Sequence, residues 1–193
     1  MSRFYGSARG KLTANYSGQA LVELALVVVL LLILVCASID FGRALNTLQV
    51  MSELSRQGSN LALRLEGTSS CDNLCTAVAD VLAGESGLNL AGNGKIIITS
   101  LSETLSGSET VGPSGGPYTI AEQDVSSGGL SATSKLGTTV GASVTLTGAP
   151  GLQKGQFLYV TEIFYGFTPA TGIGALTNNI VGMPSTLYDI AYF

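Results

Sequence analysis

The chain has 193 residues, of which 46% are hydrophobic and only 11% are charged, and its formal net charge is −4. An average soluble domain carries about 25% charged residues, so this composition favours a membrane-tethered or assembly protein over a fully soluble enzyme. The sequence contains no histidine, which removes the usual general base and the commonest metal ligand. The acidic balance provides no basic face for phosphates, so we expect no nucleic-acid partner.

Residues 1–18 carry the basic side chains Arg3, Arg9 and Lys11 and no acidic one. Small and polar residues dominate this segment, and its apolar residues show no periodicity, so we predict an unstructured basic leader. Positive charge beside a membrane helix stays on the cytoplasmic side. The N-terminus is therefore predicted to lie in the cytoplasm.

Residues 19–41 contain the one long apolar run of the chain. Glu23 is the single charge near its start, and no charged residue occurs from Leu24 to Ile39. About 20 helical residues rise about 30 Å, which is the thickness of the hydrocarbon layer. The pattern predicts a transmembrane helix over 19–41, with the remainder of the chain on the far side of the membrane.

Residues 42–66 are predicted to continue the same helix, because no proline interrupts residues 19–66. The apolar residues now recur every three or four positions, which places them on one stripe. We expect this stripe to pack on a sheet or on neighbouring helices. Its members are Phe41, Leu45, Leu48, Met51, Leu54, Gly58, Leu61 and Leu65.

Residues 67–193 are predicted to form a small α+β domain. A helix is expected over 68–83, followed by a loop over 84–94 that ends in an Asn-Gly turn signal. Period-two patterning then indicates strands. The expected strands are 95–102, 118–123, 138–147 and 156–167, followed by an apolar end at 187–193.

The segment 156–167 is the strongest strand candidate, because it is rich in aromatic and β-branched residues. Alternation places Phe157, Tyr159, Thr161, Ile163 and Tyr165 on one face. The fold class is therefore α+β. A long N-terminal helix, half transmembrane and half amphipathic, is covered in its second half by an antiparallel sheet of about four strands.

The segment from Gly18 to Glu23 is the strongest candidate for a functional site. A carboxylate in a membrane helix costs roughly 2.5–3.5 kcal/mol at mid-bilayer and less near an interface, so it needs a cationic partner. Cleavage after Gly18 would give Gln19 a new α-amine about one helical turn from Glu23. In a staggered bundle, the amine of one subunit can meet the carboxylate of another, and losing one partner of such a buried pair is costly.

Gly18 with a glutamate five residues later resembles a type IV prepilin cleavage site. The longer string from Gly18 to Leu45, including Ile39-Asp40-Phe41-Gly42-Arg43-Ala44, closely resembles the TadE-like family, the minor pilins or pseudopilins of the Tad (type IVc, Flp) pilus system. The resemblance covers residues 18 to about 66. The chain is far longer than a major Flp pilin, which indicates a minor component.

The resemblance implies removal of the leader at Gly18 by a membrane aspartyl prepilin peptidase. It also implies a helix held in the bacterial inner membrane until incorporation, a periplasmic C-terminal domain and a structural role in pilus assembly. The expected partners are other pilin subunits, the inner-membrane assembly machinery, the peptidase and the lipid bilayer. We expect no catalysis, no small-molecule substrate and no cofactor.

Two positions depart from the family pattern. Many relatives have proline where this chain has Val29, and major Flp pilins have an aromatic residue where this chain has Leu24. The usual weak point in the middle of the helix is therefore absent.

An alternative interpretation starts from Val35-Cys36-Ala37, whose small residues before Ser38 suit signal peptidase. Cleavage after Ala37 would release a secreted domain. This domain, or an uncleaved anchored one, would bind a surface ligand through its Gly/Ser-rich loops. A lipoprotein site at Cys36 is disfavoured by the bulky Val35 before it.

The remaining cysteines, Cys71 and Cys75, are four residues apart. They could form a disulfide in an oxidising periplasm, or they could remain two buried thiols, because this spacing strains a disulfide within an ideal helix. Metal binding is disfavoured, because there is no histidine and only two cysteines lie close together.

Overall fold

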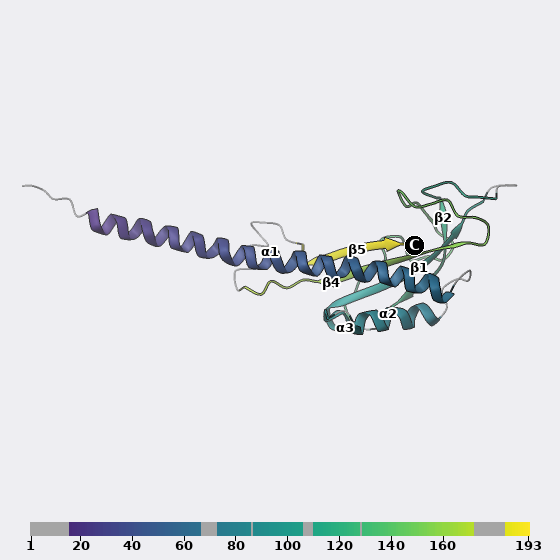
Figure 1. The fold of residues 1–193 in the computed structure, drawn as a ribbon, viewed down its shortest axis with the longest axis horizontal. Helices are drawn as coiled ribbons and strands as arrows, with labels where there is room; N and C mark the ends of the chain where they lie inside the picture. The colour runs from purple at the N-terminus through teal and green to yellow at the C-terminus, as the bar shows by residue number, and fades with distance from the viewer. Residues whose placement is uncertain (1–15, 67–72, 86, 106–109, 128, 172–183) are drawn as a thin grey trace, which may run out of the picture.

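A computed structural model describes residues 16–66, 73–85, 87–105, 110–127, 129–171 and 184–193. The chain forms one long helix, α1 (Tyr16–Glu66), whose second half packs on an α+β domain (Figure 1). The predicted continuous helix is confirmed. It begins at Tyr16, so residues 16–18 are helical and the prediction of an unstructured leader was wrong there. These residues are helical because the free-energy cost of extending an existing helix by a few residues is small. Residues 1–15 lie outside the described residues.

The domain is built on a five-stranded sheet in the order β3-β2-β1-β4-β5, and every neighbouring pair is antiparallel. The predicted α+β class is confirmed, with five strands in place of about four. The central strands β1 and β4 are the longest. The strands are β1 (Gly94–Glu103), β2 (Tyr118–Val125), β3 (Ser143–Val144), β4 (Phe157–Gly166) and β5 (Thr186–Tyr192).

The strands predicted at 95–102, 118–123 and 156–167 agree with β1, β2 and β4 to within one or two residues. The strand predicted at 138–147 is reduced to the two residues of β3. Gly141 and Gly148 on either side of it adopt positive φ angles of 86° and 85°, which turn the chain out of an extended conformation.

Two short helices precede the sheet. Helix α2 spans Asn73–Glu85 and helix α3 spans Leu90–Asn93. The predicted helix at 68–83 therefore ends two residues later than expected, and residues 68–72 lie outside the described residues. The loop predicted at 84–94 contains the extra turn α3, which begins where the Asn89 side chain accepts a hydrogen bond from the Gly92 amide at 3.1 Å.

The two faces of the sheet are buried by different elements. Helices α1 and α2 cover one face, where Tyr159 and Ile163 of β4 join a cluster with Met51 and Leu54 of α1. Leu158 of β4 points the opposite way, into a second cluster. This second cluster includes Leu146, Ala149 and Leu152 from the loop between β3 and β4.

Candidate assembly surface on the N-terminal helix

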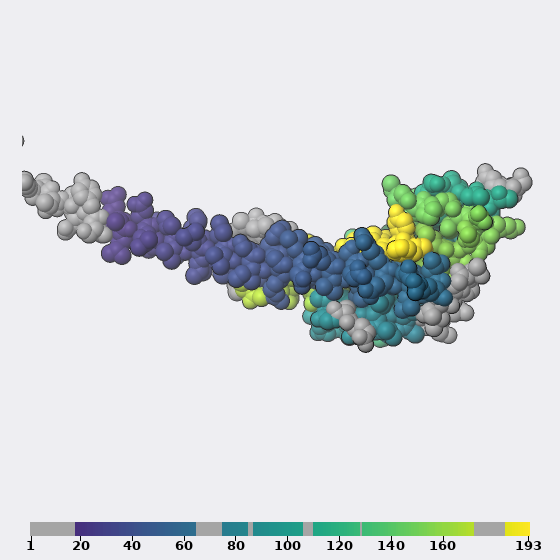
Figure 2. Space-filling view, viewed as in Figure 1, coloured from purple at the N-terminus to yellow at the C-terminus, as the bar shows by residue number. Residues whose placement is uncertain are grey.

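The first half of α1 projects away from the domain (Figures 1 and 2). The large apolar side chains from Leu21 to Val35 are 41–69% exposed. A continuous apolar surface of this size is unfavourable in water. Among the described residues, α1 is the one helix long and apolar enough to cross a membrane. The exposed apolar half of α1 is therefore a candidate membrane-spanning segment.

The predicted cleavage and pairing residues all lie on this projecting segment. Gly18, Gln19 and Glu23 are exposed, and no described atom comes within 4 Å of a Cβ built on Gly18. Gln19 and Glu23 are four residues apart in α1, so they share one face and are separated by about 6 Å along the axis. The pairing of Glu23 with an amine stays a prediction.

Asp40 anchors the domain to α1 just after the apolar run. The side chain is fully buried, and its Oδ1 accepts hydrogen bonds from the amides of Ala170 at 2.9 Å and Thr171 at 3.2 Å. The Thr171 hydroxyl donates to Oδ2. Both carboxylate oxygens are therefore satisfied by the segment after β4. The sequence analysis did not predict this anchoring role of Asp40, because its partners lie 130 residues away.

Further along α1, the contact with the sheet uses small and hydroxyl side chains. A Cβ on Gly58 would lie 3.0 Å from Leu82 and from Thr161, so the helix approaches as closely as a glycine allows. The buried Ser59 hydroxyl lies 2.9 Å from Thr161 Oγ1 and accepts a hydrogen bond from the Thr161 amide at 3.1 Å. Ser55, one turn earlier, lies 2.5 Å from Asp189 Oδ2 of β5.

The predicted apolar stripe is therefore only partly the docked face. Met51, Leu54 and Gly58 are buried as expected, but Phe41 is 53% exposed and Leu45 is 46% exposed. The sheet-facing side is offset from the stripe, because close helix–sheet approach selects small residues over large ones. Its members are Asp40, Ala44, Thr47, Met51, Leu54, Ser55, Gly58, Ser59 and Ala62. Phe41 and Leu45 extend the exposed apolar surface toward the domain.

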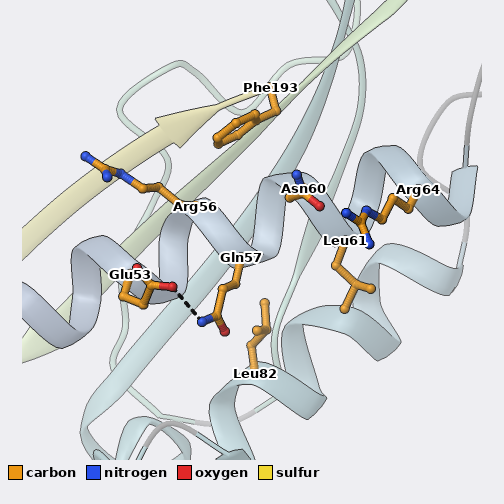
Figure 3. A pocket seen from close by; sticks show the side chains of 8 residues that line it. All are labelled: Glu53, Arg56, Gln57, Asn60, Leu61, Arg64, Leu82 and Phe193. Atoms are coloured by element: carbon orange, nitrogen blue, oxygen red, sulfur yellow. Dashed lines mark hydrogen bonds between the residues drawn. The ribbon is translucent and has the colours of Figure 1, made fainter.

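The outer side of α1 forms an open groove of about 440 Å³ with α2 and Phe193, the residue after β5. Figure 3 shows Leu82 of α2 on one side of α1 and Phe193 on the other. Along the helix, Gln57 Nε2 donates to Glu53 Oε1 at 2.8 Å. The groove contains arginines but no arrangement of a nucleophile with a base. Its lining residues are Glu53, Arg56, Gln57, Asn60, Leu61, Arg64, Leu82 and Phe193.

The far face of the sheet holds a buried carboxylate, Glu162. Its Oε1 accepts from the Lys135 amide at 3.0 Å and from the Tyr188 hydroxyl at 2.9 Å, and the Ser134 hydroxyl donates to Oε2. Lys135 Nζ lies 3.4 Å from the ring centroid of Tyr188. Burial raises the pKa of Tyr188 above its usual value, and Glu162 raises this pKa further. These bonds fix the loop around residue 134 to β4 and β5.

Cys36 lies in the apolar half of α1, whereas Cys75 lies in α2. Cys36 is free, and Cys75 is buried and takes part in a disulfide. Cys71 lies outside the described residues, so its pairing with Cys75 stays a prediction. No cluster of three or more metal-ligating side chains occurs in the part of the chain that the structure describes.

These features define a class of protein in which one candidate membrane-anchoring helix continues without a break into a folded α+β domain. Residues 18–60 match the family model of the TadE-like proteins, so the resemblance predicted from the sequence is confirmed over the helix. The match associates the chain with the Tad pilus. No curated protein and no solved structure matches the chain.

Proposed function

We propose that this chain is a structural minor pilin or pseudopilin of a Tad-type pilus and that it acts by assembly, without catalysis. The observation that supports this most is the continuity of α1. The segment that matches the TadE-like model contains the exposed apolar part and also most of the part docked on the sheet. The position that α1 takes in an assembly would therefore set the orientation of the whole domain.

In the proposed assembly, cleavage after Gly18 leaves Gln19 as the new N-terminus. The amine of Gln19, in the same or a neighbouring subunit, then pairs with Glu23. This carboxylate is exposed in the isolated chain, so an assembly would bury it. Burying it without a cation would be strongly unfavourable, and only a helix register that places an amine beside it is therefore stable.

The proposed location is the bacterial inner membrane, with the basic leader in the cytoplasm and the sheet domain in the periplasm. The excess of Arg and Lys before the apolar run supports this orientation. The partners in this proposal are other pilin subunits, the inner-membrane assembly machinery and the prepilin peptidase.

Measuring the intact mass of the protein purified from its native membrane tests the proposal directly. A chain that starts at Gln19 has been processed as a prepilin. A chain that starts at Ser38 is a secreted domain, and the assembly role of Glu23 is then wrong. A chain that keeps Met1 after coexpression with the prepilin peptidase contradicts processing at Gly18.

The alternative function, an anchored or secreted binding domain, needs only the docked part of α1. Asp40 and all later sheet contacts lie after Ala37, so cleavage there would leave the domain contacts intact. Replacing residues 19–39 with an unrelated membrane helix distinguishes the two functions. Pilus assembly is lost under the pilin proposal, whereas a binding domain keeps its activity.

A further inference from the structure

A polar pocket of about 460 Å³ lies at the edge of the domain, beside the part of α1 that directly follows the apolar segment. Three parts of the chain line it: the turn of α1 after Phe41, the loop before α3 and the end of β4. Most of the side chains that line it are polar or aromatic. They include Arg43, Asn46, Asn89, Tyr165 and Thr168.

The pocket carries one positive charge, that of Arg43, which interacts electrostatically with the carboxylate of Asp40. Arg43 is the one charged residue in its lining, and among the described residues its guanidinium makes no hydrogen bond or ion pair. Asp40, one turn earlier, is already bonded to Ala170 and Thr171. The Arg43 guanidinium is therefore available to an anion, which it can bind through two parallel hydrogen bonds.

The height of the pocket relative to a membrane is set by α1. Arg43 follows Ile39, the last residue of the apolar run, by four positions, or about 6 Å along a helix. The headgroup layer on each side of a bilayer is about 5–7 Å thick. Phe41 between them is 53% exposed, and aromatic side chains favour this boundary. The pocket therefore opens at the level of the lipid headgroups.

We propose that this pocket binds the phosphodiester headgroup of a membrane phospholipid. Arg43 holds the phosphate oxygens, the Asn46 amide and the Thr168 hydroxyl supply further hydrogen bonds, and the acyl chains run along the apolar part of α1. If Arg43 served only to anchor the helix at the membrane interface, it would not need the neighbouring polar side chains of Asn46 and Thr168. The inference requires α1 to span a membrane but does not depend on the pilus role.

Native mass spectrometry of the full-length protein in an uncharged detergent, titrated with phosphatidylglycerol, tests the site. We expect one tightly retained lipid and an apparent Kd at least about tenfold weaker in Arg43→Gln, because a charge-assisted contact is lost. Gly42→Leu should weaken binding as well. A Cβ on Gly42 meets nothing within 4 Å, so the larger side chain can occupy the pocket without disturbing the fold.

Arg56→Gln is the matched control, because Arg56 is exposed on the same helix outside this pocket. Equal effects of Arg43→Gln and Arg56→Gln would overturn the proposal. Retention of diacylglycerol, which has no phosphate, as strongly as phosphatidylglycerol would also overturn it. Displacement of the lipid by an equal concentration of inorganic phosphate would show a free-anion site instead. Alkaline extraction of each variant from membranes tests the spanning of α1 separately.

Discussion

Ser59 of α1 and Thr161 of β4 are 102 residues apart in sequence, yet the Ser59 hydroxyl lies 2.9 Å from Thr161 Oγ1 and accepts a hydrogen bond from the Thr161 amide. The same hydroxyl lies 3.0 Å from the carbonyl oxygen of Ala191, the residue that pairs with Thr161 across β4 and β5. The helix is therefore bonded directly into the strand ladder. This contact transmits the orientation of α1 to the sheet.

Ser59→Ala should lower the free energy of unfolding by about 1–3 kcal/mol, because it leaves a buried amide without its acceptor. Thermal unfolding of the full-length chain in detergent, followed by circular dichroism, measures the loss. Ser38→Ala is the control, since Ser38 bonds only to the Leu34 carbonyl of its own helix and is exposed. Equal melting temperatures for the two variants would contradict the role of Ser59.

Gly58→Leu should destabilise the domain by about 1–3 kcal/mol, because the added side chain overpacks the contact with Leu82 and Thr161. Gly84→Ala in α2 should have the opposite sign, a gain of about 1 kcal/mol, since a Cβ there meets nothing within 4 Å and alanine favours the helix. The same unfolding measurement checks both. A stable Gly58→Leu variant would show that α1 does not dock as closely as described.

Asp40→Ala should release the segment after β4 without unfolding the sheet. Hydrogen exchange at the Ala170 and Thr171 amides should accelerate, because their acceptor is removed. Asp80→Ala provides a matched control. Asp80 accepts from the Ser127 amide at 2.8 Å, so its removal should accelerate exchange at Ser127 alone. Unchanged protection at Thr171 in Asp40→Ala would contradict the anchoring role.

Stability should fall as the pH rises above about 10, the usual pKa of tyrosine. Burial raises the pKa of Tyr188 in the folded state, and Glu162 adds to this shift. The unfolded chain therefore loses this proton first, and the contribution of Tyr188, complete below pH 10, decreases as the pH rises.

Unfolding of Tyr188→Phe at pH 7 and above pH 10 isolates the contribution of this residue. The pH dependence should become shallower but not vanish, because burial also raises the pKa of Tyr118. Tyr118→Phe is the parallel variant. An unchanged slope in Tyr188→Phe would contradict the proposed linkage.

Glu23→Ala should leave membrane insertion and cleavage largely intact but impair incorporation into pili, because the carboxylate that selects the helix register is gone. Immunodetection of the protein in sheared pili and in the membrane fraction separates these steps. Glu53→Ala is the control, since Glu53 is also exposed on α1 but lies within the domain. Normal piliation in Glu23→Ala would contradict the proposed pairing.

The local elements of this protein follow from sequence pattern alone. The apolar run, the absence of proline and the period-two alternation in 156–167 predicted α1 and β4, because helices and strands depend on side-chain spacing over a few residues. The TadE-like segment is likewise a local string, from Gly18 onward. The strand expected at 138–147 was mostly absent, because positive-φ glycines at 141 and 148 break the extended conformation.

The tertiary structure decided which side of α1 meets the sheet. Periodicity alone assigned Phe41 and Leu45 to the packed stripe, but in the folded chain Asp40 and Ser59 are buried on the docked side instead. The partners of these residues lie more than 100 positions away. No local pattern encodes such contacts, because they depend on how the chain folds back on itself. The sequence thus determined the apolar segment and the long helix, and the fold determined which residues of the helix contact the domain and which stay exposed.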